Sequence, residues 1–199
     1  AAILARIGDL DRGVAVTAAL GELGELERLD LESWPRGAGS LCKVGFAGES
    51  AAPDWRERFR TQAERLRERG WRLLPAAYLD HEAAAAPAPR AILDLAARAP
   101  GRTMLLDTFR KDRRWRDLLD RETAAALSAG RHRLALAGSF QASDVAEADA
   151  IFDRPPAIIA VRGAACRGAD RGAPIDESKV RELQSALLAH AWRGRGEAE

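Results

Sequence analysis

The chain has 199 residues, of which 47% are hydrophobic and 31% charged, enough for one sizeable core and a single domain over residues 1–199. Its 31 basic and 30 acidic residues give a net charge of +1, so no long-range field attracts a polyanion and no nucleic acid partner is expected. No apolar run approaches the roughly 20 residues that cross a bilayer, so no membrane partner is expected either.

Cysteines and histidines are few and scattered. Cys42 and Cys166 do not make a disulfide framework, and His81, His132 and His190 form no cluster. No pair has the spacing of metal ligands, so no metal is expected. A reducing, cytoplasmic compartment is the default for such a chain.

Six short apolar runs predict strands. They are Val14–Leu20, Leu41–Phe46, Arg72–Tyr78, Thr103–Asp107, Leu134–Gly138 and Ala157–Arg162. Their nearly continuous apolar character is typical of parallel strands buried on both faces.

The segments between these runs show the single apolar face of amphipathic helices. The faces are marked by Trp55, Phe59 and Leu66, by Ile92, Leu95 and Ala96, by Trp115, Leu118, Leu119 and Leu127, and by Val180, Leu183, Leu187 and Ala191. Asp176 is the expected cap of the last helix. Further helices are expected at Ala2–Leu10 and Ala142–Ala150, and residues 193–199 are expected to form a disordered tail. Alternating strands and helices indicate an α/β fold, either an open sheet or part of a barrel.

The basic residues divide unevenly, into 28 arginines and the three lysines Lys43, Lys111 and Lys179. A desolvated lysine can lose its proton and act as a base or an imine-forming nucleophile, whereas arginine stays charged. Lys43 lies inside an apolar strand, where a charge costs several kcal/mol unless it is paired or neutralised. Lys43 is therefore either a reactive amine or the partner of a core carboxylate.

A second lysine follows the end of another predicted strand. Asp107 ends the run 103–107, and Lys111 comes four residues later. The ends of barrel strands gather at one mouth, where two amines would repel each other and favour a neutral amine in one of them. Asp107 can then orient an ammonium group or shuttle a proton. The alternative is a salt bridge within the loop.

Small residues follow the last two predicted strands. Gly138 ends the run 134–138 and is followed by Ser139, and Gly163 follows the run 157–162. Small residues let backbone amides approach a phosphate, and loops after the last two strands of a barrel commonly bind one. Tight packing of strand against helix is the alternative explanation.

Six strand-end motifs together resemble the (5-formylfuran-3-yl)methyl phosphate synthase family. They are Val16-Thr17-Ala18-Ala19-Leu20-Gly21-Glu22, Lys43-Val44-Gly45-Phe46, Tyr78-Leu79-Asp80, Leu106-Asp107-Thr108 with Lys111-Asp112, Leu136-Ala137-Gly138-Ser139, and Val161-Arg162-Gly163-Ala164-Ala165-Cys166 with Gly168 and Asp170-Arg171. They occur in the family's order over nearly the whole chain.

The resemblance implies a TIM-type (β/α)8 barrel and a carbon–oxygen lyase acting on phosphates. Such an enzyme condenses two molecules of glyceraldehyde 3-phosphate into (5-formylfuran-3-yl)methyl phosphate, with loss of phosphate and water, in methanofuran biosynthesis. No cofactor or metal is implied, and the expected partner is a small phosphosugar substrate; a homo-oligomer stays open. By motif, Lys43 resembles the family's general base, and Asp107 and Lys111 its supporting pair. Gly138, Ser139, Arg162 and Gly163 resemble its phosphate-binding positions.

This sequence also departs from the family. The family's first two strands have no counterpart here, and the second carries an Asp-x-Lys whose lysine forms a Schiff base. We therefore expect a barrel that lacks its first two strands and is inactive and poorly soluble as it stands. Glu22 replaces the family's usual Asp, and Arg113 replaces a Gly.

Two other functions remain open. The chain can belong to a barrel enzyme for a different phosphosugar, an aldolase or isomerase with the same phosphate loops. It can also be a non-catalytic barrel fragment that binds a phosphometabolite, or a partner chain along its open edges. The absent Schiff-base lysine favours the fragment, whereas Lys43 and Lys111 favour an enzyme.

Overall fold

The computed structural model of the protein describes residues 17–34, 36–37, 40–99, 101–130 and 132–190. The predicted helix at Ala2–Leu10, the start of the predicted strand Val14–Leu20 and the predicted tail 193–199 lie outside these residues. No helix of the described part is long and apolar enough to span a bilayer.

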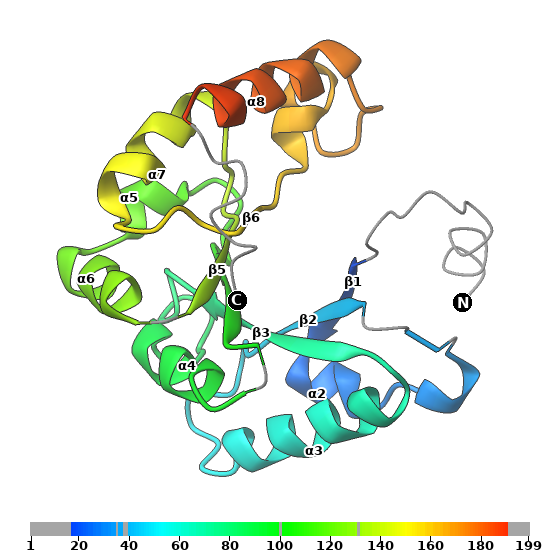
Figure 1. Ribbon diagram of the computed structural model, residues 1–199. Helices are drawn as coiled ribbons and strands as arrows, with labels where there is room; N and C mark the ends of the chain where they lie inside the picture. Colours follow the sequence, from blue (N-terminus) through cyan, green and yellow to red (C-terminus); the bar gives the residue numbers. More distant parts are fainter. Residues whose placement is uncertain (1–16, 35, 38–39, 100, 131, 191–199) are drawn as a thin grey trace.

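Six strands form one sheet, in which all strands run parallel and follow one another in chain order. They are β1 (Thr17–Glu22), β2 (Leu41–Gly45), β3 (Arg72–Tyr78), β4 (Thr103–Asp107), β5 (Arg133–Leu136) and β6 (Ile158–Ile159). Figure 1 shows that the strands trace an arc and not a flat layer. The protein is therefore an α/β fold whose six-stranded parallel sheet is curled into a half-barrel.

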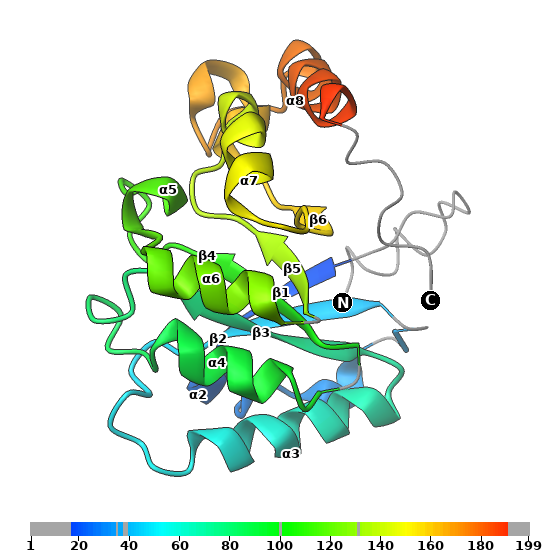
Figure 2. The same cartoon turned by 60° about the vertical axis from the view of Figure 1, so that its left-hand side comes forward.

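The helices follow the strands along the chain and line the outer side of the arc (Figure 1). They are α2 (Leu23–Leu26), α3 (Trp55–Glu68), α4 (Pro89–Ala96), α5 (Trp115–Leu118), α6 (Arg121–Ala129), α7 (Val145–Ile151) and α8 (Glu177–Ala189), with 3-10 turns at Leu31–Ser33, Ala142–Asp144, Gly163–Ala165 and Arg167–Ala169. In Figure 2, α4 lies between α3 and α6 along this outer side. The predicted cap of the last helix is confirmed, because the Asp176 carboxylate accepts the Ser178 amide at 2.9 Å.

Apolar residues cover both faces of the sheet. Between sheet and helices, Val44, Met104 and Leu136 pack in one core with Phe59 and Ile92, each at most 2% exposed. A smaller cluster on the opposite, concave face consists of Leu74, Ala76, Leu105, Ala135 and Ala137. This double burial is why the strands read as continuous apolar runs, with little alternation of polar residues.

Three predicted elements need correction. The single helix expected around Trp115 and Leu127 is two helices, because the chain is extended at Leu119 and Asp120. Asp120 starts the second of these as its N-cap, accepting the Thr123 amide at 2.7 Å. The strand expected at Leu134–Gly138 ends at Leu136, since Gly138 turns with φ +86°. The last strand is only Ile158–Ile159, and it pairs with β5 alone among the described strands.

Candidate active site

Asp107, the last residue of β4, lies between two lysine side chains. Its Oδ2 is 3.9 Å from Lys43 Nζ, and its Oδ1 is 3.3 Å from Lys111 Nζ. The carboxylate is 13% exposed and each lysine side chain 41% exposed. One carboxylate thus joins two amines from different strands, at the mouth where the sequence predicted that both would converge.

Lys43 reaches Asp107 from the concave face of the sheet. Its neighbours Cys42 and Val44 are fully buried in the core beneath the helices. Because successive residues of a strand face opposite sides, Lys43 faces the inside of the arc. It is in register with Leu74 of β3, so its side chain extends across β3 to the end of β4.

Lys111 lies on the loop after β4 and folds back over the end of its own strand. Its ammonium also donates to the Thr108 carbonyl, and Asp107 Oδ1 accepts the Thr108 amide at 2.8 Å. Residues 107–111 therefore form a turn that is closed by hydrogen bonds between its two ends. The amine is held above the strand end by these bonds, although the side chain stays 41% exposed.

These contacts agree with both explanations of the two lysines: salt bridges to Asp107, and a pair of reactive amines. The sequence led us to expect that two converging amines would favour a neutral form in one of them, an effect that burial strengthens. Among the described residues, both side chains keep 41% of their surface exposed. Strong desolvation is therefore not supplied by these six strands alone.

A second polar group lies at the ends of β1 and β3. The Tyr78 hydroxyl donates to Glu22 Oε1 at 2.6 Å, and Glu22 Oε2 accepts the Ala47 amide at 2.7 Å. Tyr78 is 9% exposed. Burial and the hydrogen bond to Glu22 raise the pKa of its hydroxyl above the ordinary value, because both disfavour the phenolate. Tyr78 is thus a core ring whose hydroxyl is hydrogen-bonded to Glu22.

Gly138 and Ser139 follow β5 next to the lysine loop. A Cβ on Gly138 would lie 2.8 Å from Thr108 Cγ2 and 3.1 Å from Trp115 Cβ, so close packing by itself requires a glycine there. The Ser139 hydroxyl donates to the Lys111 carbonyl at 3.1 Å. It must give up this bond before it can donate to a phosphate.

Arg162 and Gly163 lie one strand further along the arc, after β6. The Arg162 side chain is exposed. A Cβ on Gly163 would come within 2.9 Å of the Ala169 carbonyl oxygen. Close packing against the following turn is therefore enough to explain a glycine at this position. The predicted phosphate-binding role of Gly163 stays untested.

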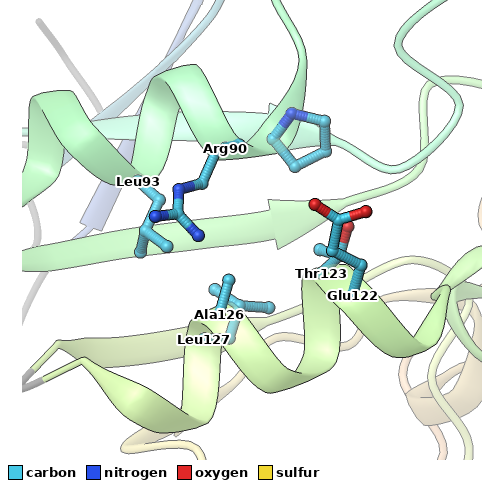
Figure 3. Close-up of a pocket in the computed structure, with 7 residues that line it drawn as sticks. Arg90, Leu93, Glu122, Thr123, Ala126 and Leu127 are labelled. Carbon is cyan, nitrogen blue, oxygen red and sulfur yellow. The ribbon is translucent and has the colours of Figure 1, made fainter.

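The helices enclose a small pocket far from these strand ends. Figure 3 shows it between α4 and α6, with Arg90 and Leu93 on one side and Glu122, Ala126 and Leu127 on the other. Its volume is about 40 Å³, whereas sites for small molecules usually measure roughly 300–1,000 Å³. We regard it as a gap in helix packing. In the part of the chain that the structure describes, no three His, Cys, Asp or Glu side chains gather as metal ligands would.

Comparison with known proteins settles the relationship that the strand ends indicated. The sequence model of the family described as 4-HFC-P synthase matches residues 2–184. The chain belongs to the 4-HFC-P synthase family. A curated relative from Methanopyrus kandleri, named (5-formylfuran-3-yl)methyl phosphate synthase, is 33% identical over 154 residues, which cover 73% of this chain and 64% of the relative. The chain thus spans less than two thirds of that relative's length.

The 4-HFC-P synthase match includes every residue of the candidate site, since all lie within residues 2–184. The structure brings Lys43, Asp107 and Lys111 into contact and joins Ser139 to the Lys111 loop. Sequence reasoning did not assign Glu22 a place beside Tyr78. The available signal was position, because both are polar residues at the carboxyl ends of predicted parallel strands, where active sites of such folds lie.

Proposed function

We propose that this chain supplies the strand-end chemistry of a synthase that condenses two molecules of glyceraldehyde 3-phosphate. The product would be (5-formylfuran-3-yl)methyl phosphate, with phosphate and water released, in methanofuran biosynthesis. One observation carries the proposal: in a chain of the 4-HFC-P synthase family, a single carboxylate, Asp107, holds the amines of Lys43 and Lys111 at one sheet edge.

The roles follow from position. Lys43 extends from the concave face and is the proposed general base, which removes a proton beside a carbonyl. Asp107 orients both ammonium groups, because it accepts a hydrogen bond from Lys111 and forms an ion pair with Lys43 at 3.9 Å. Lys111 supplies positive charge where a phosphate departs. Backbone amides near Gly138 and Gly163, with the Arg162 guanidinium, are the proposed phosphate contacts.

The same proposal assigns the six strands to a TIM-type (β/α)8 barrel. The strands are parallel, follow chain order and curl, as strands of such a barrel do. Closure would pair the outer edges of β1 and β6, which are otherwise rows of unpaired backbone groups. It would also remove Lys43 and Lys111 from water, which the six strands do not do.

By the family resemblance, the imine-forming lysine of this mechanism belongs to two strand–helix units that come before the strands described here. The proposal therefore concerns the completed barrel, meaning this chain joined to the first two strand–helix units of a family member. In that protein, the added lysine would bind the aldehyde of one substrate as an imine, and borohydride would trap it. The genomic sequence upstream of Ala1 offers a simple check for an in-frame Asp-x-Lys.

The test compares the completed barrel with the 199-residue chain. We expect glyceraldehyde 3-phosphate to disappear with release of phosphate in the completed barrel, and no turnover in the chain alone. A folded, completed barrel that consumes the substrate without releasing phosphate would indicate the other phosphosugar aldolase or isomerase. One that binds but does not consume it would indicate the non-catalytic fragment.

A further inference from the structure

The loop that carries Lys111 is held by a carboxylate from the neighbouring strand end. Asp80 follows β3, and its Oδ1 accepts the Phe109 amide at 2.6 Å while its Oδ2 accepts the Arg110 amide at 2.9 Å. These are the two residues directly before Lys111. One carboxylate therefore fixes two successive peptide planes, and hydrogen bonds to an ionised acceptor are stronger than neutral ones.

The loop is also held from its other side and by its own contacts. The Ser139 hydroxyl, after β5, donates to the Lys111 carbonyl at 3.1 Å. The Phe109 ring, although 41% exposed, packs edge-on against Tyr78 with centroids 5.5 Å apart. Strand ends on both sides thus restrain the turn between Asp107 and Lys111, and the Asp80 carboxylate makes two of the restraining bonds.

We propose that Asp80 is a positioning residue for Lys111. It acts through the backbone by setting the direction from which the Lys111 side chain leaves the loop, so that the ammonium returns to Asp107. This inference rests on the proposed function for its catalytic meaning. The structural claim, that Asp80 controls where the Lys111 amine lies, holds whether or not the completed barrel turns over.

The position of Lys111 can be followed without turnover. The sequence contains only three lysines, Lys43, Lys111 and Lys179, so reductive methylation with carbon-13 formaldehyde gives three resolvable side-chain signals. Lys179 lies on α8 and pairs with Glu182 at 2.9 Å, which makes it an internal reference. Hydrogen exchange of the Phe109 and Arg110 amides reports the two Asp80 bonds directly.

Asp80→Asn loses the charge and one acceptor oxygen at nearly the same volume. We expect the Phe109 and Arg110 amides to exchange at least tenfold faster, with exchange in α3 unchanged. The Lys111 methyl signal should move towards that of free dimethyl-lysine at each pH of a titration, and the Lys179 signal should stay. Asp80→Glu keeps the charge on a longer side chain, and we expect it to restore part of both effects.

The matched control is Asp94→Asn, which removes a carboxylate from the exposed face of α4, where Asp94 lies 3.6 Å from Arg90. It should change neither readout. Unchanged loop amides or an unmoved Lys111 signal in Asp80→Asn would overturn the inference. Equal loss of protection in α3 would overturn it too, because Asp80 would then hold the whole fold. An inactive completed barrel, in contrast, would count only against the proposed synthase.

Discussion

The Tyr78 hydroxyl and the Glu22 carboxylate meet at 2.6 Å above the strand that separates them. Tyr78 ends β3 and Glu22 ends β1, with β2 between. They can meet because the β2 residue below them is Gly45, on which a Cβ would lie 2.2 Å from the Tyr78 oxygen and 2.3 Å from Glu22 Oε2. The absence of a side chain at Gly45 therefore allows three strand ends to share one hydrogen-bonded group.

Gly45→Ala should therefore destabilise the protein. The new methyl group must displace Tyr78 or Glu22, and forcing an extra carbon into a packed site costs about 1–3 kcal/mol. Urea unfolding, followed by tryptophan fluorescence, measures the loss. Gly24→Ala is the matched control, because a Cβ there meets nothing closer than 3.8 Å. In helix α2 that control should be neutral or slightly stabilising, and a similar loss in both variants would contradict the steric argument.

The ionisation of Tyr78 should make stability fall at high pH. Its pKa is raised in the folded protein, so the unfolded chain releases this proton first, near pH ~10. The contribution is fully present below that pH. It is lost above it by about 1.4 kcal/mol per pH unit, until the folded hydroxyl also ionises. Urea unfolding between pH ~9 and ~11 should show this extra slope, and Tyr78→Phe should lack it.

Tyr78 is the only tyrosine of the chain, so its ionisation can be observed directly. The near-ultraviolet absorbance of tyrosinate should appear at lower pH in urea than in the folded protein. Equal titration curves in both states would mean that the hydroxyl is not held by Glu22 in solution.

The sequence predicted the middle of the sheet better than its edges. The strands at Arg72–Tyr78 and Thr103–Asp107 were expected with these bounds, since each has an apolar run between its ends and a partner on both sides. The last strand shortened to Ile158–Ile159, because an edge strand lacks one row of hydrogen bonds that would extend it. Whether a strand has a neighbour on one side or on both depends on the tertiary fold, so the local sequence pattern does not predict it.

The site was predicted in part for a similar reason. A lysine within an apolar strand and an Asp–Lys pair at a strand end are visible in the sequence, and Lys43, Asp107 and Lys111 do meet. The bonds from Asp80 to the amides at 109 and 110 depend on how far two strand ends extend. Nothing in the spacing between Asp80 and Lys111 signals them. The phosphate-binding roles of Gly138, Ser139, Arg162 and Gly163 stay predictions.

Asp144→Ala should destabilise the fold more than any surface change. The Asp144 carboxylate is fully buried and accepts hydrogen bonds from the Arg114 guanidinium, the Trp115 indole at 3.3 Å and the Gln141 amide at 2.9 Å. Removing it leaves these donors unpaired, at a cost of about 3–5 kcal/mol. Unfolding in urea should show this loss. Asp153→Ala, at an exposed carboxylate, should stay within about 0.5 kcal/mol, and a comparable effect at both sites would refute the buried network.

Exchanging each lysine for arginine in the completed barrel separates the proposed base from a purely electrostatic partner. Arginine keeps the positive charge and the pairing with Asp107 but does not give up its proton. Lys43→Arg should therefore lower the rate of phosphate release from glyceraldehyde 3-phosphate by about 10²–10⁴-fold. It should still bind glycerol 3-phosphate, which lacks the aldehyde, as tightly as the parent. Lys111→Arg should keep most of the rate if Lys111 serves only as a charge.

Lys179→Arg provides the control for this series, because Lys179 lies on α8 and its partner Glu182 can pair equally well with arginine. It should leave both rate and binding unchanged. A Lys43→Arg protein with full activity would remove Lys43 from the chemistry. If Lys111→Arg were then the inactive variant, the base would be the amine on the loop, and Lys43 would be the residue that supplies charge through Asp107.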